Sequence, residues 1–350
     1  MRGWDGLRRR GAGAVLASAL LFGVSMPLAK ILLHHADAGV VAGLLYLGSG
    51  TGLIVYRRIV RAGAVHVPRR DWPWLLAAIT TGGVIGPLLL MVGLAHLPAA
   101  NASLLLNTET PMTAALAWAV FGEHVDRRIV AGLSAIVAGA ILLGGRLHGV
   151  QAVTSWPAMA VLGACLAWAL DNNFTRKVSL LDAAWLASVK GLAAGSINLL
   201  LALAAGAVLP AWRDVGAALL LGFFAYGVSL VFFVLGLRHL GAARAGGYFA
   251  TAPFLGAVAA VILGEPVTPV LLFAAALMGF GVWLQLSEHH EHVHTHTALA
   301  HEHEHTHDIH HQHTHALPVV PGMRHTHWHV HEPLSHSHPH FPDAHHDHDH

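Results

Sequence analysis

Long apolar runs separated by short polar connections occupy the first 287 residues of the chain. A transmembrane helix needs roughly 20 consecutive, mostly apolar residues. Runs of this kind are predicted as helices near residues 12–33, 37–56, 72–95, 98–121, 128–147, 155–176, 182–208, 214–237, 241–263 and 267–287. None of them shows the strict alternation of apolar and polar residues that marks a barrel strand. The pattern therefore predicts an all-α integral membrane protein with ten transmembrane helices, embedded in a lipid bilayer.

The basic residues between these helices are distributed unequally. Fifteen lysines and arginines fall in segments that share a side with the N-terminus, whereas only Lys30, Arg146 and Arg213 fall on the other side. Loops rich in Lys and Arg stay in the cytoplasm. Both termini are therefore predicted to be cytoplasmic, in a multi-pass protein of the plasma (inner) membrane.

One stretch of sequence occurs twice. Gly93 to Glu123 and Gly236 to Glu265 both open with Gly-Leu-x-His-Leu and both end in Gly-Glu. A proline stands twelve residues before the final glutamate of each copy, Pro111 in the first and Pro253 in the second. The repeat indicates that one half of the protein was built like the other.

The repeat divides the chain into a five-helix unit over 12–147, a second over 155–287 and a tail over 288–350. Because five is odd, the two units must insert in opposite orientations. Inverted repeats of this type hold a substrate pathway near the bilayer midplane, where the halves meet, and alternate by moving one half against the other. This organisation predicts a transporter of a small molecule.

The repeats also resemble a known family. The two terminal Gly-Glu pairs, Phe22 to Lys30 in the first helix and its partner Trp168 to Lys177 are similar to the EamA type of the drug/metabolite transporter (DMT) superfamily. The resemblance covers about residues 12–287. It implies a ten-helix inverted-repeat fold and transport of small organic solutes, often by efflux. Asn107 to Thr110 departs from the family, because apolar or small residues are more usual before this proline.

Composition excludes several other functions. The chain is 55% hydrophobic and 11% charged, with a mean hydropathy of +0.55, whereas soluble domains carry about 25% charged residues. The single cysteine, Cys165, excludes a disulfide framework or a thiolate metal site within one chain. The arginines sit at membrane edges, so no nucleic-acid partner is expected. No nucleophile–base pair or phosphate loop is evident, so we expect neither an enzyme nor a required cofactor.

Glu109 is the sharpest candidate for the transport pathway. It lies about 16 Å along its predicted helix at 1.5 Å per residue, close to the midplane, where an ionisable residue is functional by default. Asn107, Thr108 and Thr110 surround it, and Pro111 interrupts the helical hydrogen bonds beside it. Glu109 is predicted to carry a proton or to bind a cationic group of the substrate. The alternative is a polar residue that only holds two helices together.

Further polar residues are predicted to line the same pathway. Asp171, Asn172 and Asn173 follow one another on the sixth helix, so they point in different directions around it. Asp171 either lines the pathway or forms a structural ion pair with Arg176 or Lys190. Lys190 lies too deep to reach the membrane surface and needs a carboxylate partner, for which Asp171 and Glu109 are available.

Three charged residues at helix ends have simpler interpretations. Lys30 can extend to the membrane surface or contact a ligand. Glu123 and Glu265 stand at helix C-termini, where the helix dipole disfavours a carboxylate. Both glutamates are predicted to be structural, with Arg127 or Arg128 as a partner for Glu123.

The tail holds 24 of the 31 histidines, mostly as His-x-His. With almost no apolar residues it is predicted to be disordered. Alternate histidines of an extended chain can chelate Zn²⁺, Ni²⁺ or Co²⁺ in loose, interchangeable sites. The predicted ligands are His292, His294, His296, His301, His303, His305, His307, His325, His327, His329, His331, His345, His346, His348 and His350. A cytoplasmic pH sensor is an alternative role, because imidazoles titrate near 6.5.

Three functions compete at this point. The first is a secondary active exporter of a small organic metabolite or drug-like solute, coupled to protons through Glu109. The second is a divalent-metal efflux carrier whose tail gathers metal ions, although no histidine–carboxylate cluster occurs within the helices. The third is a metal sensor or store attached to a carrier that no longer transports.

Overall fold

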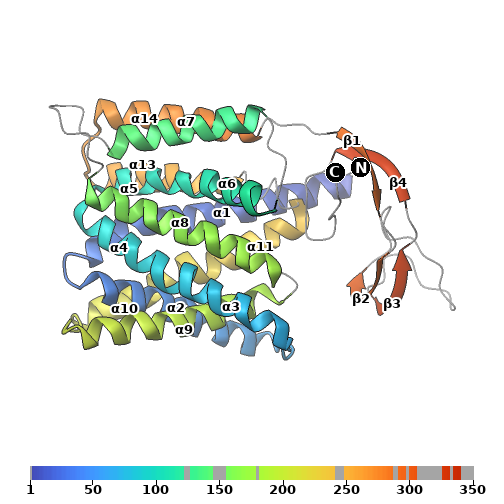
Figure 1. Cartoon of the computed structure of the whole chain (residues 1–350). Helices are drawn as coiled ribbons and strands as arrows, with labels where there is room; N and C mark the ends of the chain where they lie inside the picture. Colours follow the sequence, from blue (N-terminus) through green and yellow to red (C-terminus); the bar gives the residue numbers. More distant parts are fainter. Residues whose placement is uncertain are drawn as a thin grey trace. The chain divides into compact units, whose positions relative to one another are not determined.

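A computed structural model describes the secondary structure of residues 2–121, 127–144, 155–178, 181–240 and 248–286, and of four short segments of the tail, 291–296, 299–305, 325–331 and 334–339. The chain divides into two compact units, Met1–Glu288 and His289–His350. The first unit is helical, and its helices run roughly side by side (Figure 1).

Helices follow one another through the first half of this unit with short connections. The first half consists of α1 (Arg2–Leu32), α2 (Ala38–Ile59), η1 (Arg69–Asp71), α3 (Trp72–Ala78), η2 (Ile79–Ile85), α4 (Gly86–His96), α5 (Ala99–Leu105), η3 (Leu106–Thr108), α6 (Glu109–Phe121) and α7 (Arg127–Gly144). The second half consists of α8 (Trp156–Lys177), α9 (Ala183–Ala204), α10 (Trp212–Gly222), η4 (Phe223–Val228), α11 (Ser229–Leu240), α13 (Ala252–Ile262) and α14 (Pro269–Leu286). Helix thus forms in every one of the predicted apolar runs.

Among the described residues, five helical segments are long and apolar enough to cross a membrane. They are Gly11–Leu32, Ala38–Ile59, Arg69–His96, Ala183–Ala204 and Trp212–Gly236, with shorter apolar helices at Val130–Leu143, Ala252–Ile262 and Pro269–Leu284. Large apolar side chains also cover the outside of the unit, such as Ile262 and Phe273, which are 77% and 72% exposed. A surface of this kind is suited to lipid.

The helices pack in pairs that join the two halves. α2 lies against α9, α7 against α14, α1 against α11 and α4 against α8 (Figure 1). Ser18 of α1 and Ser229 of α11 exchange two hydrogen bonds, each hydroxyl donating to the other's carbonyl oxygen, at 2.6 and 3.0 Å. Packing between halves, rather than within each half, therefore holds the unit together.

α2 and α10 approach each other so closely that only glycine fits at the contact. A Cβ at Gly48 would collide with the backbone carbonyl of Leu219, and a Cβ at Gly222 would collide with that of Leu45. A backbone carbonyl cannot turn aside as a side chain can, so added bulk would separate the helices.

Gly48→Ala is therefore expected to destabilise the protein by about 1–3 kcal/mol, the usual cost of overpacking. Gly216 of α10 is the matched control, because a Cβ there would meet nothing within 4 Å. Gly216→Ala should be neutral or stabilising by up to about 1 kcal/mol. Thermal unfolding of the purified proteins in detergent measures both effects, and equal midpoints for the two variants would contradict the close contact.

Four described segments of the tail form short strands, and disorder of the tail as a whole stays a prediction. β1 (Glu291–His296) pairs with β4 (Leu334–Pro339), and β2 (Leu299–His305) pairs with β3 (His325–His331), both antiparallel. Strand pairing satisfies backbone N–H and C=O groups without an apolar core. The His-x-His pattern, with Thr and Val between histidines, also has the two-residue period of a strand.

Candidate functional site

One side of the site is built around the backbone carbonyl group of Gly82, which accepts hydrogen bonds from two side chains. In the π-helical segment η2, hydrogen bonds join residues five apart, and the N–H of Gly86 donates to Thr81. Gly82 would receive the next bond from Pro87, which has no N–H. Two side chains replace it: the Tyr46 hydroxyl at 3.0 Å and Trp168 Nε1 at 2.9 Å both donate to the Gly82 oxygen. α2 and α8 are thereby fixed against η2.

Glu109 begins α6 at a break in the helix. Pro111 cannot donate to the carbonyl four residues earlier, and the preceding turn is the 3₁₀ segment η3. Asn172 of α8 donates from Nδ2 to Glu109 Oε1 at 2.8 Å, and the same nitrogen lies 3.5 Å from the Thr113 hydroxyl. One amide thus holds the Glu109 carboxyl group against α8.

Asp171, which precedes Asn172 on α8, forms an ion pair with Lys190 of α9. Asp171 accepts a hydrogen bond from Lys190 of α9 through Oδ2 and one from Thr175 at 3.0 Å through Oδ1. The side chain of Asp171 is 9% exposed and that of Lys190 is 17% exposed. A Cβ at Gly82 would collide with the Asp171 carboxylate, so this glycine makes room for the pair.

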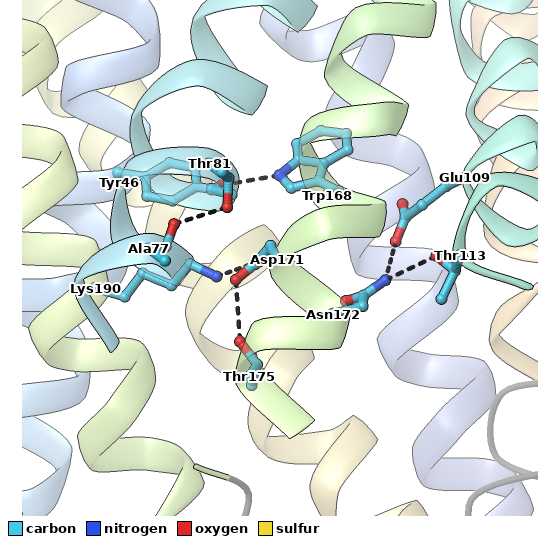
Figure 2. Close-up of polar contacts among 11 residues, drawn as sticks. Tyr46, Ala77, Thr81, Glu109, Thr113, Trp168, Asp171, Asn172, Thr175 and Lys190 are labelled. Carbon is cyan, nitrogen blue, oxygen red and sulfur yellow. Dashed lines mark hydrogen bonds and ion pairs between the residues drawn. The ribbon is translucent and has the colours of Figure 1, made fainter. Parts of the chain in front are cut away.

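These two interactions face different directions from adjacent positions of α8. Figure 2 shows Lys190 meeting Asp171 on one side of the helix and Glu109 meeting Asn172 on the other. We refer to Glu109, Asn172, Asp171 and Lys190 as the polar cluster. Of the two partners expected for Lys190, the structure supplies Asp171, and it links Glu109 to an amide instead.

The other predicted pathway residues bond to their own helices. Asn107 donates to Leu104 at 3.2 Å, Thr108 donates to Leu105 at 2.7 Å, and Asn173 donates to Ala169 at 2.8 Å. All three predicted residues are buried, with at most 9% exposure. They shape the backbone around the polar cluster, as Pro111 does, and the structure does not bring their polar groups into it.

Lys30 and Glu265 lie outside the cluster and secure the corner between α4 and α5. Each of the three N–H donors of the Lys30 ammonium has a carbonyl acceptor at the end of α4, in Leu94, Ala95 and Leu97, at 2.7–2.9 Å. Glu265 accepts from the backbone N–H of Ala99 at 2.6 Å and of Ala100 at 2.8 Å. Lys30 thus caps the C-terminus of α4, and Glu265 caps the N-terminus of α5.

The sequence predicted a structural role for Glu265 but not the helix that it caps. This role was predicted for it because the helix dipole disfavours a carboxylate at the C-terminus of its own helix. Its partner could not be found, because the N-terminus that it caps belongs to a helix more than 160 residues earlier. Gly122 and Glu123, the equivalent pair of the first repeat, lie outside the described residues.

Glu265→Gln is expected to lower stability by about 1 kcal/mol, as loss of a helix cap does. A neutral amide offers one acceptor oxygen in place of two and loses the favourable charge at the α5 N-terminus. Asp71→Asn is the control, because Asp71 lies 3.6 Å from an Arg70 side chain that is 88% exposed. Such surface pairs contribute little. Thermal midpoints in detergent that fall equally for both variants would contradict the capping role.

The described tail strands place several predicted metal ligands opposite each other. The backbone register pairs His292 with His338, His294 with His336, His301 with His329, His303 with His327 and His305 with His325. His296 and His331 also lie in strands, opposite leucines. His307, His345, His346, His348 and His350 lie outside the described residues. Within the part of the chain that the structure describes, no cluster of three His, Cys, Asp or Glu residues that could hold a metal ion was found.

Apolar helices of membrane-spanning length, with ionisable side chains held between them, define a multi-pass membrane transporter. Sequence comparison gives the same class. Residues 9–145 and 155–287 each match the EamA-like transporter family, and the chain belongs to this family.

Individual relatives agree with this assignment. An uncharacterized transporter of Methanothermobacter thermautotrophicus is 27% identical over 290 residues, which cover 77% of this chain and 84% of that protein. A probable amino-acid metabolite efflux pump of Salmonella typhimurium is 26% identical over 185 residues, or 49% of this chain and 55% of that protein. A protein of known crystal structure shares the fold with a TM-score of 0.59 and 20% identity, over 78% of this chain and 95% of that one.

Proposed function

We propose that the protein is a secondary active transporter that exports a small organic metabolite or drug-like solute in exchange for protons. The observation that carries the proposal is the polar cluster, because ionisable side chains inside an apolar bundle mark substrate and proton pathways. Lys190 and Asp171 balance each other's charge. Glu109 has only neutral hydrogen-bonding partners among the described contacts, so its carboxyl group is the one suited to gaining and losing a proton.

We further propose that the halves form two inverted five-helix repeats. In this arrangement α1, α4 and α6 of the first half correspond to α8, α11 and α13 of the second half. Each contact then has a counterpart: α1 packs against α11 as α8 packs against α4, and α1 packs against α13 as α8 packs against α6. The π-helical segments η2 and η4 occupy equivalent places in their halves. Asp37 and Asp182 cap the equivalent helices α2 and α9 by accepting from backbone N–H groups. This correspondence supports alternating access, with one half moving against the other.

The proposed direction of transport is supported by a relative, and the proposed orientation in the membrane is supported by the charge distribution. The Salmonella relative is described as an efflux pump, which supports export by this chain. The arginine-rich connections support cytoplasmic termini. Solute would then bind from the cytoplasmic side and leave as Glu109 takes up a proton from outside.

Reconstituted protein tests the proposal directly. Proteoliposomes should accumulate one or more compounds from a panel of amino acids, amines and drug-like solutes when a pH gradient is imposed, and should not do so without it. The same panel should include Ni²⁺, Co²⁺ and Zn²⁺. Gradient-driven flux of the metals alone would refute organic-solute export in favour of metal efflux.

A second candidate function, metal binding by the tail, is favoured by the strand register. Five pairs of histidines stand opposite each other, two where β1 pairs with β4 and three where β2 pairs with β3. Imidazole is a good ligand for Zn²⁺, Ni²⁺ and Co²⁺. Calorimetric titration should detect binding to the full chain and not to a chain truncated after Glu288. If metal efflux is the function, truncation should lower metal tolerance of cells. Under organic-solute export, the truncated chain should transport normally.

A further inference from the structure

A pocket lined with arginines opens where the end of α2 meets the start of α9. It has a volume of about 270 Å³, and its lining includes Arg57, Arg58, Arg61, Trp185 and Ser188. Arg57 and Arg58 belong to the last turn of α2 and Arg61 follows its end, and all three contribute to the lining of this one pocket. We call this site the arginine pocket. It is separate from the polar cluster, none of whose residues line it.

The charge of the arginine pocket is only partly balanced. Arg57, whose side chain is 12% exposed, donates to Asp182 Oδ1 at 2.5 Å and to the Gly63 carbonyl oxygen at 2.8 Å. No hydrogen bond or ion pair joins Arg58 or Arg61 to an acidic residue anywhere in the described part of the chain. Arg57 is therefore fixed in place, and two guanidinium groups are left to bind an anion.

The backbone of Arg61 adopts a left-handed conformation that arginine rarely adopts. α2 ends in a Schellman motif, in which Ala62 N–H donates to Arg57 and Arg61 N–H donates to Arg58. The left-handed position of this motif usually holds glycine, but Arg61 occupies it with φ of 51°. Glycine would be more stable in this conformation. Strained backbone of this kind is typical of residues kept for function.

The surroundings of the pocket identify the source of the anion. α2 and α9 both have the length and composition of transmembrane helices, so the pocket at their ends lies at the level of lipid headgroups. Trp185 in the first turn of α9 is the residue type that favours this level. Val55 and Ile59, which neighbour Arg58 on α2, are 54% and 75% exposed, and they offer an apolar surface for an acyl chain beside the charged pocket.

We propose that the arginine pocket binds the phosphate group of an anionic phospholipid. Guanidinium groups form paired hydrogen bonds with phosphate oxygens, and basic pockets between transmembrane helices recognise anionic headgroups. A soluble phosphate would use the same guanidinium groups but would gain nothing from the apolar surface at Val55 and Ile59. The lipid should therefore bind far more tightly than inorganic phosphate.

Native mass spectrometry of the full chain in detergent tests this site with phosphatidylglycerol and phosphatidylcholine. The parent protein should retain phosphatidylglycerol and not phosphatidylcholine. Arg58→Gln/Arg61→Gln should weaken phosphatidylglycerol binding by roughly 30-fold, as loss of two cationic contacts predicts. Arg213→Gln is the matched control, because Arg213 lies beside Trp212, 5.9 Å from the ring centroid, without lining the pocket. It should bind lipid like the parent.

Arg61→Gly separates lipid binding from folding. It should keep or raise the thermal midpoint in lipid-free detergent, because glycine suits the left-handed conformation, and it should still weaken phosphatidylglycerol binding. Unchanged lipid binding in both variants would overturn the proposal. Inorganic phosphate or glycerol phosphate that displaces the lipid at equal concentration would show a soluble-anion site and would also overturn it.

Discussion

Glu109→Gln is expected to abolish solute accumulation driven by a pH gradient. Glutamine has nearly the same size as glutamate, and its carbonyl oxygen can still accept the hydrogen bond that Asn172 Nδ2 donates at 2.8 Å. The substitution therefore removes the ability to carry a proton while keeping the local geometry. For exchange of one proton per solute, the parent should accumulate solute up to about tenfold per pH unit of gradient, since one unit corresponds to a factor of ten. The variant should not exceed the level reached without a gradient.

The measurement is uptake of a transported compound into proteoliposomes, with and without the gradient. Exchange of labelled for unlabelled solute at equal pH provides the second readout, because it needs binding and alternation but no net proton movement. Glu109→Gln should retain this exchange if the carboxyl group serves the proton and not the fold. Glu265→Gln is the matched carboxyl-to-amide control and should retain gradient-driven accumulation per folded molecule. Full accumulation by Glu109→Gln would remove this residue from the mechanism.

The helices were predictable because the bilayer imposes a simple requirement. A run of apolar residues long enough to span hydrocarbon must satisfy its backbone internally, and a helix does so. The predicted runs consequently fall on helices throughout the described residues. The π-helical segment η2 was missed, and the side chains that bond to its backbone come from helices that are distant in the sequence. Tyr46 and Trp168 satisfy the Gly82 oxygen, and nothing local to Ile79–Ile85 specifies them.

The sequence predicted all four residues of the polar cluster, but only one of the two interactions between them. An ionisable residue in an apolar run is conspicuous, so Glu109, Asp171 and Lys190 could be selected from sequence alone. The Asp171–Lys190 pair is among the predicted partnerships and is confirmed by the structure. The bond between Glu109 and Asn172 was not predicted, because charge suggests a cationic partner for a carboxylate and sequence does not reveal which faces of α6 and α8 meet.

The helix ends show why capping is harder to infer across a long sequence distance. Glu265 follows its own helix, where the helix dipole opposes a carboxylate. In the structure it serves the start of α5 instead, where the dipole favours it. Lys30 similarly meets carbonyl groups at the end of α4 rather than the membrane surface. In both cases the local rule was sound, but the relevant helix terminus belonged to a different part of the chain.

Separating Asp171 from Lys190 is expected to have the largest effect on stability of any single substitution considered. Asp171→Asn leaves a lysine that is 17% exposed without its counter-charge, and Lys190→Met leaves a carboxylate that is 9% exposed. Removing one partner of a buried ion pair costs about 3–5 kcal/mol, whereas replacing both is often nearly neutral. Each single variant should therefore unfold at a much lower temperature in detergent, and Asp171→Asn/Lys190→Met should recover most of the loss.

The recovered double variant then distinguishes two roles for the pair. If Asp171 and Lys190 only join α8 to α9, the double variant should transport solute at the parental rate once its stability is restored. If the pair must open during the transport cycle, the double variant should fold and bind solute yet lose the alternation that moves it across the membrane. Because Asp171 neighbours Asn172, which holds Glu109, we expect the second result. Failure of the double variant to recover stability would show that the two residues do not act as a pair.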